Sequence, residues 1–304
     1  MYADFEEVVR AVKGHGGKRV IAVAGAEDRP VIEAALHAQR EGIAEAVFVG
    51  DAGKIDSILK EIGEDPAACK IEAAGPQGAG QTAVELVQDG RANVLMKGLL
   101  ETRDLLKPVV SKSNRLNMGR PMTHLAFFKL PNYHKLIVNT DGGMMVYPTL
   151  EEKKSIIENA VAALRAMGYE RPKVGVLAGI EKVNPKMTET VEADALKQMA
   201  LRGEITGCDV EGPVSYDVAM SAEIARHKGF QCPWCGDFDV LVVPSLVTGN
   251  VLGKSWTVTA GADMAGIVVG ARAPIVLTSR GSTAKEKFYA IALASLAAAG
   301  ISPM

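Results

Sequence analysis

The segment PIVLTSRGSTAKEKFYAIALASLAAAG, residues 274–300, places a strand pattern directly before a helix pattern. Pro274–Thr278 is a short apolar run with β-branched residues, which is typical of a buried parallel strand. From Lys285 on, apolar residues recur at helical spacing. The segment therefore predicts a strand that leads through a short turn into a helix.

The turn within this segment carries Ser279, Arg280, Gly281 and Ser282. A helix N-terminus offers unpaired N–H groups and a partial positive charge, which suits a bound anion. The same residues would also suit a plain capping turn, with Ser282 or Thr283 as the N-cap and Arg280 solvated. This stretch alone leaves both interpretations open.

Strand-like and helix-like runs alternate along almost the whole chain. KRVIAVAGA (18–26) has a strand pattern, and the amphipathic run that follows it (30–42) has a helix pattern. The clearest helix begins at Thr149, has Glu152 three positions on as a capping box requires, and ends at Gly168. This alternation predicts an α/β protein whose parallel sheets are covered by helices.

Length and composition narrow the class of protein. The 304 residues are 48% hydrophobic and 23% charged, as in ordinary globular proteins, and the length favours two domains. The net charge of −2, without a long basic block, gives no support for a nucleic-acid or membrane-surface partner. The start of the chain lacks an apolar signal core, and no apolar run is long enough to span a membrane, so we expect a cytoplasmic protein.

Two of the four cysteines form the motif Cys232-Pro-Trp-Cys235. A thioredoxin-like dithiol has its first cysteine at a helix N-terminus, whereas this pair precedes the strand pattern DVLVVPS. Cys69 and Cys208 are too isolated in sequence to complete a zinc site. We therefore expect two ordinary thiols on a loop, with redox or metal chemistry as the weaker alternative.

The candidate binding residues follow the predicted strands. In open α/β sheets, ligands bind outside the carboxyl ends of the strands. Each candidate also has a local explanation, because an Asp-Gly pair forms turns and a proline suits the first position of a helix. Convergence along one sheet edge nevertheless predicts a substrate site that contains Lys97, Gly98, Asp141, Asn184, Glu211, Gly212, Pro213, Gly249, Asn250, Ser279 and Arg280.

Several familiar motifs are absent from the sequence. No GxGxxG dinucleotide turn follows the first strand, and no GxSxG nucleophile elbow occurs. The five histidines are scattered without metal-ligand spacing, so no metal site is expected.

Five ordered blocks resemble the phosphate acetyl/butyryltransferase family, with a preference for the butyryl branch. The resemblance runs from about residue 97 to the C-terminus. The blocks are NTDGGMMVYPTLEEKKSIIENAV (139–161), VGVLAGIEKVNPKMTETVEA (174–193), VEGPVSYDVAMS (210–221), LVVPSLVTGNVLGKS (241–255) and VGARAPIVLTSRGSTAKEK (269–287).

The resemblance implies an architecture similar to the isocitrate/isopropylmalate dehydrogenase group. Two parallel-sheet α/β domains would face each other across a cleft. Residues 1–126, completed by 272–304, would form the first domain, and residues 127–271 the second. The resemblance also implies a homodimer.

The reaction that the resemblance implies is acyl-CoA plus phosphate giving acyl phosphate plus coenzyme A. Coenzyme A is then a substrate, and no cofactor is needed. By position in the family motif, Arg280 would bind phosphate and Ser279 would hydrogen-bond the sulfur of coenzyme A. Glu286 would be the candidate base, with a register uncertain by one residue.

Some positions depart from the family pattern. Gly281-Ser282 is closer to the acetyl branch, Glu211 stands where the family has aspartate, and Ser245 replaces a usual acidic residue. Two other classes therefore stay open. One is a metal-dependent hydroxy-acid dehydrogenase, for which Asp237 and Asp239 have poor spacing, and the other is a non-catalytic acyl-CoA or metabolite-binding relative.

Overall fold

The computed structural model describes residues 1–17, 19–75, 77–278 and 281–300. The chain divides into two compact units. Unit 1 comprises Met1–Asp4 and Pro121–Met264, and unit 2 comprises Phe5–Arg120 and the segment from Ala265 on. Both units contain helices and strands in alternation, which confirms the predicted α/β class.

Unit 2 contains a mostly parallel sheet with the strand order β3-β2-β1-β4-β11-β10, in which only the β10–β11 pair is antiparallel. Its order reverses between β1 and β4. The elements are α1 (Phe5–Gly14), β1 (Val20–Ala24), α2 (Arg29–Arg40), β2 (Glu45–Gly50), α3 (Ala52–Glu61), the 3₁₀ helix η1 (Pro66–Ala68), β3 (Lys70–Ala73), α4 (Ala79–Gln88), β4 (Val94–Lys97), α5 (Thr102–Val110), β10 (Asp263–Val269), β11 (Ile275–Val276) and α11 (Ala284–Ala299).

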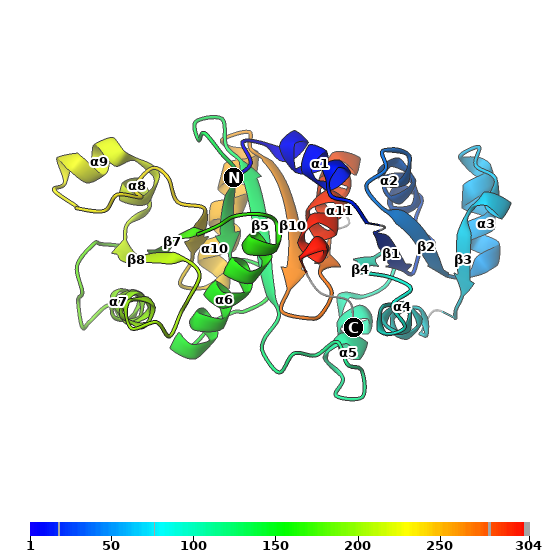
Figure 1. Cartoon of the computed structure of the whole chain (residues 1–304), viewed down its shortest axis with the longest axis horizontal. Coiled ribbons are helices and arrows are strands. Elements are labelled where there is room, and N and C mark those ends of the chain that lie inside the picture. Colours follow the sequence, from blue (N-terminus) through cyan, green and yellow to red (C-terminus); the bar gives the residue numbers. More distant parts are fainter. Residues whose placement is uncertain (18, 76, 279–280, 301–304) are drawn as a thin grey trace. The chain divides into compact units, whose positions relative to one another are not determined.

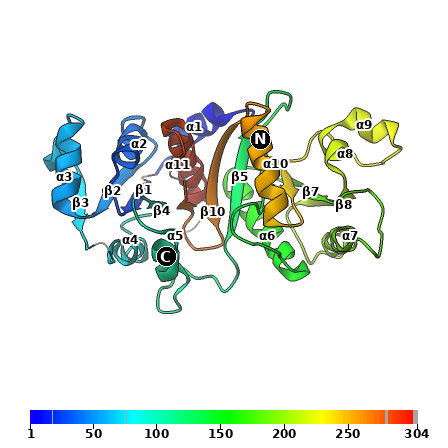
Figure 2. The same cartoon turned by 180° about the vertical axis from the view of Figure 1, so that it is seen from behind.

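Helix α11 is the buried helix of unit 2. Its first turn is exposed at Ala284 and Lys285, but every residue from Lys287 to Ala298 is buried, and from Phe288 on the sequence is mostly apolar, as expected of a helix segment with no solvent face. It packs against α1 and α2 (Figure 1; Figure 2 gives the view from behind). The Tyr289 ring stacks on Phe5 with centroids 4.7 Å apart, and its hydroxyl donates to Glu6 at 2.6 Å. The last described helix thus packs against the first helix.

Unit 1 contains a second set of strands in the order β5-β6-β9-β7-β8, all parallel except the β5–β6 pair. Its elements are β5 (Thr123–Lys129), β6 (Ile137–Thr140), α6 (Leu150–Ala166), β7 (Lys173–Leu177), α7 (Thr188–Leu201), β8 (Asp209–Val214), α8 (Tyr216–Met220), α9 (Ala222–His227), β9 (Val240–Val242) and α10 (Leu246–Val258).

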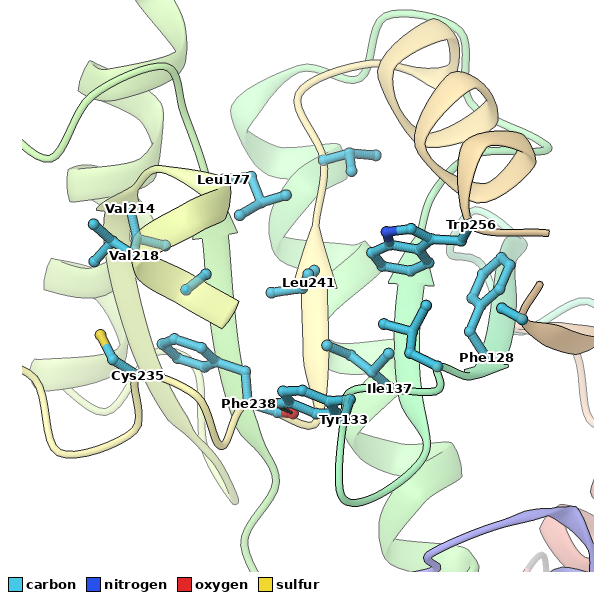
Figure 3. Packing of buried hydrophobic residues seen from close by; sticks show 14 of the residues in the cluster. Phe128, Tyr133, Ile137, Leu177, Val214, Val218, Cys235, Phe238, Leu241 and Trp256 are labelled. Atoms are coloured by element: carbon cyan, nitrogen blue, oxygen red, sulfur yellow. Dashed lines mark hydrogen bonds between the residues drawn. The ribbon is translucent and has the colours of Figure 1, made fainter. Parts of the chain in front are cut away.

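The core of unit 1 joins its sheet to the helices on one face. Figure 3 shows Tyr133 and Phe238 beside Ile137 and Leu241, and Phe128 close to Trp256. The Tyr133 hydroxyl donates to the Phe238 carbonyl at 2.9 Å, so the one polar atom of that ring is satisfied.

The amino end of α6 confirms the local signal in the sequence. The Thr149 hydroxyl accepts a hydrogen bond from the main-chain N–H of Glu152, and the Glu152 carboxylate accepts one from the Thr149 main chain. The helix ends before Gly168, whose φ of 94° is in the left-handed region that favours glycine. Both ends of this helix could therefore be predicted from local residues.

Asp237 and Asp239 have structural partners at the amino end of β9. Asp239 is buried, and its carboxylate lies 2.7 Å from the Lys135 ammonium and accepts a hydrogen bond from the Lys173 main chain at 2.8 Å. Asp237 is ion-paired with the same two lysines, and its carboxylate lies 3.0 Å from Nε2 of His134. These contacts tie β9 to β7 and to the loop before β6, at the amino ends of the parallel strands.

Among the described residues, no helix combines the length and apolar character needed to cross a bilayer.

Candidate functional site

Unit 2 contains a cavity of about 570 Å³ at the carboxyl ends of its central strands. The sheet order reverses between β1 and β4, and such switch points are where open α/β sheets bind ligands. The volume is within the range of small-molecule sites. Its lining consists of Asp28, Pro30, Val31, Gln77, Lys97, Gly98, Leu99, Leu100, Glu101, Asp104, Thr278 and Lys287.

Lys97 and Gly98, which were predicted as binding residues, both line this cavity. Lys97 ends β4, and its ammonium donates to the Gly98 carbonyl at 3.2 Å. Gly98 runs against the backbone that follows β1, because its N–H donates to Ala24 at 2.8 Å and the next N–H donates to Gly25 at 2.6 Å. A Cβ at Gly98 would come within 2.1 Å of the Gly25 carbonyl oxygen. Close backbone approach is therefore the reason for glycine at this position.

The amino end of α11 shows which residue caps the helix. Thr283 is the N-cap, and its hydroxyl accepts from the Glu286 main chain at 3.1 Å. The Glu286 carboxylate accepts from the Thr283 main chain at 2.9 Å, so the predicted base is part of a capping box. Ser279 and Arg280, the other two predicted catalytic residues, lie outside the described residues.

Lys287 is a cavity-lining residue that sequence reasoning missed. Its side chain is buried, although it is lysine in the first turns of a helix. Its ammonium donates to the Ser282 carbonyl. The apolar run that begins at Phe288 was a partial signal, but it does not distinguish the buried Lys287 from the exposed Lys285 two positions earlier.

In unit 1, Asp141 shapes the loop after β6. It is 1% exposed, and its carboxylate accepts three main-chain hydrogen bonds: from Gly143 at 2.8 Å, from Met144 at 2.7 Å and from His124 at 3.0 Å. The Thr140–Asp141 peptide bond is cis. The predicted binding residue thus uses its carboxylate to hold the Asp-Gly-Gly loop and the neighbouring strand β5 in place.

Gly249 and Asn250 lie inside α10, where they brace the same loop. A Cβ at Gly142 would come within 2.8 Å of the Gly249 carbonyl carbon, so loop and helix touch backbone to backbone. Asn250 donates to the Gly142 carbonyl at 3.5 Å, and the buried Asn139 donates to the Gly249 carbonyl at 2.8 Å. Asn139 was not predicted, because nothing in its local sequence indicates a partner in α10. Ser245, one of the departures from the family pattern, is the N-cap of α10.

Glu211, Gly212 and Pro213 lie within β8 instead of after it. The strand continues to Val214, so the alternative in which Pro213 begins a helix is also wrong; the next helix starts at Tyr216. The Glu211 carboxylate is buried, lies 2.6 Å from the Lys197 ammonium and accepts from the Gly212 main chain at 3.0 Å.

Asn184 begins the turn that leads into α7. Its N–H donates to the Thr190 hydroxyl at 2.8 Å, and its side-chain oxygen accepts from the Lys186 main chain at 3.0 Å. Asn184 thus has local structural partners on the loop after β7. Asn184 and Glu211 are therefore separate from the group around Asp141 in their hydrogen bonding.

A polar cluster missed by the sequence analysis follows β7 and β8. The Ser215 hydroxyl lies within hydrogen-bond distance of the carboxylates of Glu181 and Asp217. Lys228 lies 3.1 Å from Glu181 and 2.9 Å from Asp217. The hydrogen bond from Ser215, together with the Lys228 ammonium, lowers the pKa of Asp217 to about 2. The cluster fastens the loop after β7 to the segment of α8 and α9.

Cys232 and Cys235 lie on a turn between α9 and β9, as predicted. The Cys232 sulfur accepts a hydrogen bond from the Trp234 main chain at 3.4 Å. Burial raises the pKa of the Cys235 thiol to about 12 and also raises the pKa of the Cys232 thiol. Both sulfurs are therefore thiols near neutral pH, which makes them poor nucleophiles.

The amino-acid sequence is similar to those of known proteins. A family model described as "Phosphate acetyl/butaryl transferase" matches residues 77–295. The chain is 41% identical over 299 residues to the phosphate butyryltransferase of Clostridium acetobutylicum, which covers 98% of this chain and 99% of that protein. It is 39% identical over 291 residues to the phosphate acetyltransferase of Thermotoga maritima, covering 96% of this chain and 98% of that protein.

Solved structures give the same relationship. The branched-chain phosphotransacylase from Enterococcus faecalis has a TM-score of 0.80 and 31% identity, covering 92% of this chain and 99% of that chain. The 4-hydroxythreonine-4-phosphate dehydrogenase of Klebsiella pneumoniae has a TM-score of 0.55 and 15% identity, covering 93% of this chain and 100% of that chain, which is a likeness of fold alone.

The contact between Gly98 and Gly25 predicts the effect of a single methyl group. Gly98→Ala should lower the free energy of unfolding by about 3 kcal/mol, because the new Cβ meets backbone that cannot rotate away. Gly16→Ala is the matched control, since its Cβ meets nothing within 4 Å, and it should change stability by less than about 0.5 kcal/mol. Urea unfolding followed by far-UV circular dichroism measures both. Equal stability of the two variants would contradict the constraint.

Proposed function

Because the chain belongs to the phosphate acetyl/butyryltransferase family and is a phosphate acyltransferase, we propose that it moves a short acyl group between coenzyme A and inorganic phosphate. A phosphate oxygen attacks the thioester carbonyl carbon, the C–S bond breaks, and the thiolate of coenzyme A takes up a proton. The observation that carries the proposal is the cavity of unit 2, whose lining combines the cations Lys97 and Lys287 with apolar side chains and with three carboxylates on other segments.

Catalysis of this reaction requires mainly that the protein position the two reactants, phosphate and the thioester. Holding phosphate against a thioester contributes on the order of 7–11 kcal/mol to lowering the barrier. No covalent nucleophile is needed, and the raised thiol pKa of Cys235 fits that conclusion. By family position, Arg280 would bind phosphate through its guanidinium fork, and Ser279 would donate to the sulfur as negative charge develops there.

The acyl group that we propose is a short alkyl chain of the butyryl class. Its support is the 41% identity to a phosphate butyryltransferase and the apolar part of the cavity lining. Pro30, Val31, Leu99 and Leu100 supply that apolar part, and Leu99 is 59% exposed. An alkyl chain would remove such a side chain from water.

Butyryl-CoA should therefore be a better substrate than acetyl-CoA. Two additional methylenes, each worth about 0.8 kcal/mol when buried, give about a 15-fold higher kcat/KM. Thiol release measured with acetyl-, propionyl- and butyryl-CoA at saturating phosphate tests the order. Equal kcat/KM values would remove the apolar lining as the acyl site, and no thiol release with any of the three would remove the proposed function.

Glu286 has an observed role as part of the capping box of α11 and a proposed role as the catalytic base, and two variants distinguish these roles. One carboxylate oxygen accepts from the Thr283 main chain, and the other is the oxygen that would accept a proton. Glutamine also completes a capping box, so Glu286→Gln keeps the cap and removes the base. Thr283→Ala does the reverse, because it removes the capping hydroxyl and keeps the carboxylate.

If Glu286 is the base, Glu286→Gln should lower kcat by about 10²–10⁴-fold with little change in melting temperature. Thr283→Ala should lower stability by about 1 kcal/mol and leave kcat close to that of the parent chain. Steady-state kinetics and thermal melts of both variants provide the comparison. A Glu286→Gln variant with normal kcat would leave this carboxylate as a cap only.

We also propose that the chain forms a homodimer. The support is the family resemblance and an apolar face on α10 of unit 1. Val247, Val251 and Val258 are 55%, 59% and 84% exposed, and their spacing places them on neighbouring positions of the helix surface. Exposed valines in such a row are typical of an interaction surface.

Light scattering should give twice the chain mass, and Val251→Glu should shift the protein towards the monomer, because burying a carboxylate in an apolar interface is costly. Val110→Glu, at an exposed valine on α5 of unit 2, is the control and should not change the mass. A parent chain that stays monomeric at all concentrations would refute the dimer, and an unchanged mass for Val251→Glu would refute this face.

A further inference from the structure

Lys287 differs from the other buried lysines of the described chain. Lys135, Lys153 and Lys287 are all buried. Lys135 lies 2.7 Å from the Asp239 carboxylate, and Lys153 is paired with Glu192. The Lys287 ammonium donates to a main-chain carbonyl, that of Ser282, and no carboxylate of the described residues lies within ion-pair distance of it.

A buried ammonium without a counter-ion is unfavourable. Transfer of a charge out of water is strongly unfavourable unless an opposite charge and hydrogen bonds compensate. An ammonium has three N–H donors, and the Ser282 carbonyl accepts one of them. Because Lys287 lines the cavity of unit 2, a ligand in that cavity can supply both the missing negative charge and the missing acceptors.

The surroundings of Lys287 favour a small anion in the part of the cavity next to α11. It lies one turn into α11, whose N-terminus adds a partial positive charge. Thr278, which lines the same cavity, immediately precedes Ser279 and Arg280 in the chain. The acidic lining residues, Asp28, Glu101 and Asp104, belong to the loops and helices that follow β1 and β4. The cations of the lining are thus Lys287 on α11 and Lys97 at the end of β4, and the carboxylates lie on the segments that follow β1 and β4.

We propose that Lys287 is a phosphate-binding residue, whose ammonium donates to an oxygen of inorganic phosphate while it keeps its bond to the Ser282 carbonyl. The proposal rests on the proposed function in taking phosphate as the anion. Phosphate would then be bound by two cations, Arg280 and Lys287. The bound phosphate would also neutralise the buried charge of Lys287, which no carboxylate of the described residues neutralises. A charge-assisted hydrogen bond of this kind is shorter and stronger than a neutral one.

Phosphate binding in the absence of acyl-CoA tests the proposal directly. Calorimetric titration with inorganic phosphate should give a Kd that is about 10–100-fold higher for Lys287→Gln than for the parent chain, the loss expected for a hydrogen bond to a charged group. Lys287→Arg should show a smaller rise, because it keeps the charge in another geometry. Lys285→Gln, two positions earlier on the exposed surface of α11, is the matched control and should bind phosphate like the parent.

Kinetics separate phosphate from the phosphate groups of coenzyme A. The KM for phosphate should rise in Lys287→Gln by a factor similar to that of the Kd, with the KM for butyryl-CoA close to the parental value. A rise confined to the KM for butyryl-CoA, or an unchanged phosphate Kd in a variant with a lower melting temperature, would overturn the proposal. The latter result would mean that Lys287 only holds the Ser282 carbonyl.

A measurement on the unaltered chain covers the case in which Lys287→Gln does not fold. Acetic anhydride labelling followed by peptide mass spectrometry should show that phosphate slows acetylation of Lys287 and not of Lys285. Equal labelling with and without phosphate would overturn the proposal. Binding and labelling need no turnover, so a chain that binds phosphate at Lys287 and releases no thiol would refute the proposed function and leave this site in place.

Discussion

The close passage of two backbone segments at Gly98 and Gly25 is the constraint on which the cavity of unit 2 depends. The contact holds the loop after β4 against the loop after β1, at the point where the strand order reverses. Lys97 and Leu99 flank the contact and line the cavity as a result. A Cβ at Gly98 would lie 2.1 Å from the Gly25 carbonyl oxygen and would push the two loops apart. At Gly25 the φ of 67° favours glycine, and a Cβ there would lie 3.1 Å from the Leu99 carbonyl oxygen.

In unit 1, several polar side chains in or near the strands bond to backbone groups or to other side chains. Asp141 accepts three main-chain hydrogen bonds, and Asn139 and Asn250 connect α10 to the loop that Asp141 shapes. Glu211 neutralises Lys197 inside unit 1. Such hydrogen bonds and ion pairs hold nearby atoms in a fixed geometry, which is what a site that works by positioning requires.

The buried lysines of the two units have different bonding partners. In unit 1, Lys135 and Lys153 are matched by carboxylates, which makes them part of the fold. In unit 2, Lys287 has a carbonyl partner and a place in the cavity lining. A buried cation that no carboxylate neutralises favours the binding of an anion, and it lowers the stability of the protein without that anion.

Local sequence determined the α/β alternation, the strand-to-helix order at residues 274–300, the capping box of Thr149 and Glu152, the cavity position of Lys97 and the family. These features depend on residues a few positions apart or on the order of motifs, and both are visible in one dimension. Only the tertiary structure showed that Asn139 reaches Gly249, that Lys197 neutralises Glu211, that β8 continues through Pro213, and that Lys287 lines a cavity. Those facts depend on which strands are neighbours and on how closely a helix approaches a loop, because a polar side chain at a strand end has the same local sequence whether it binds a ligand or a distant backbone group.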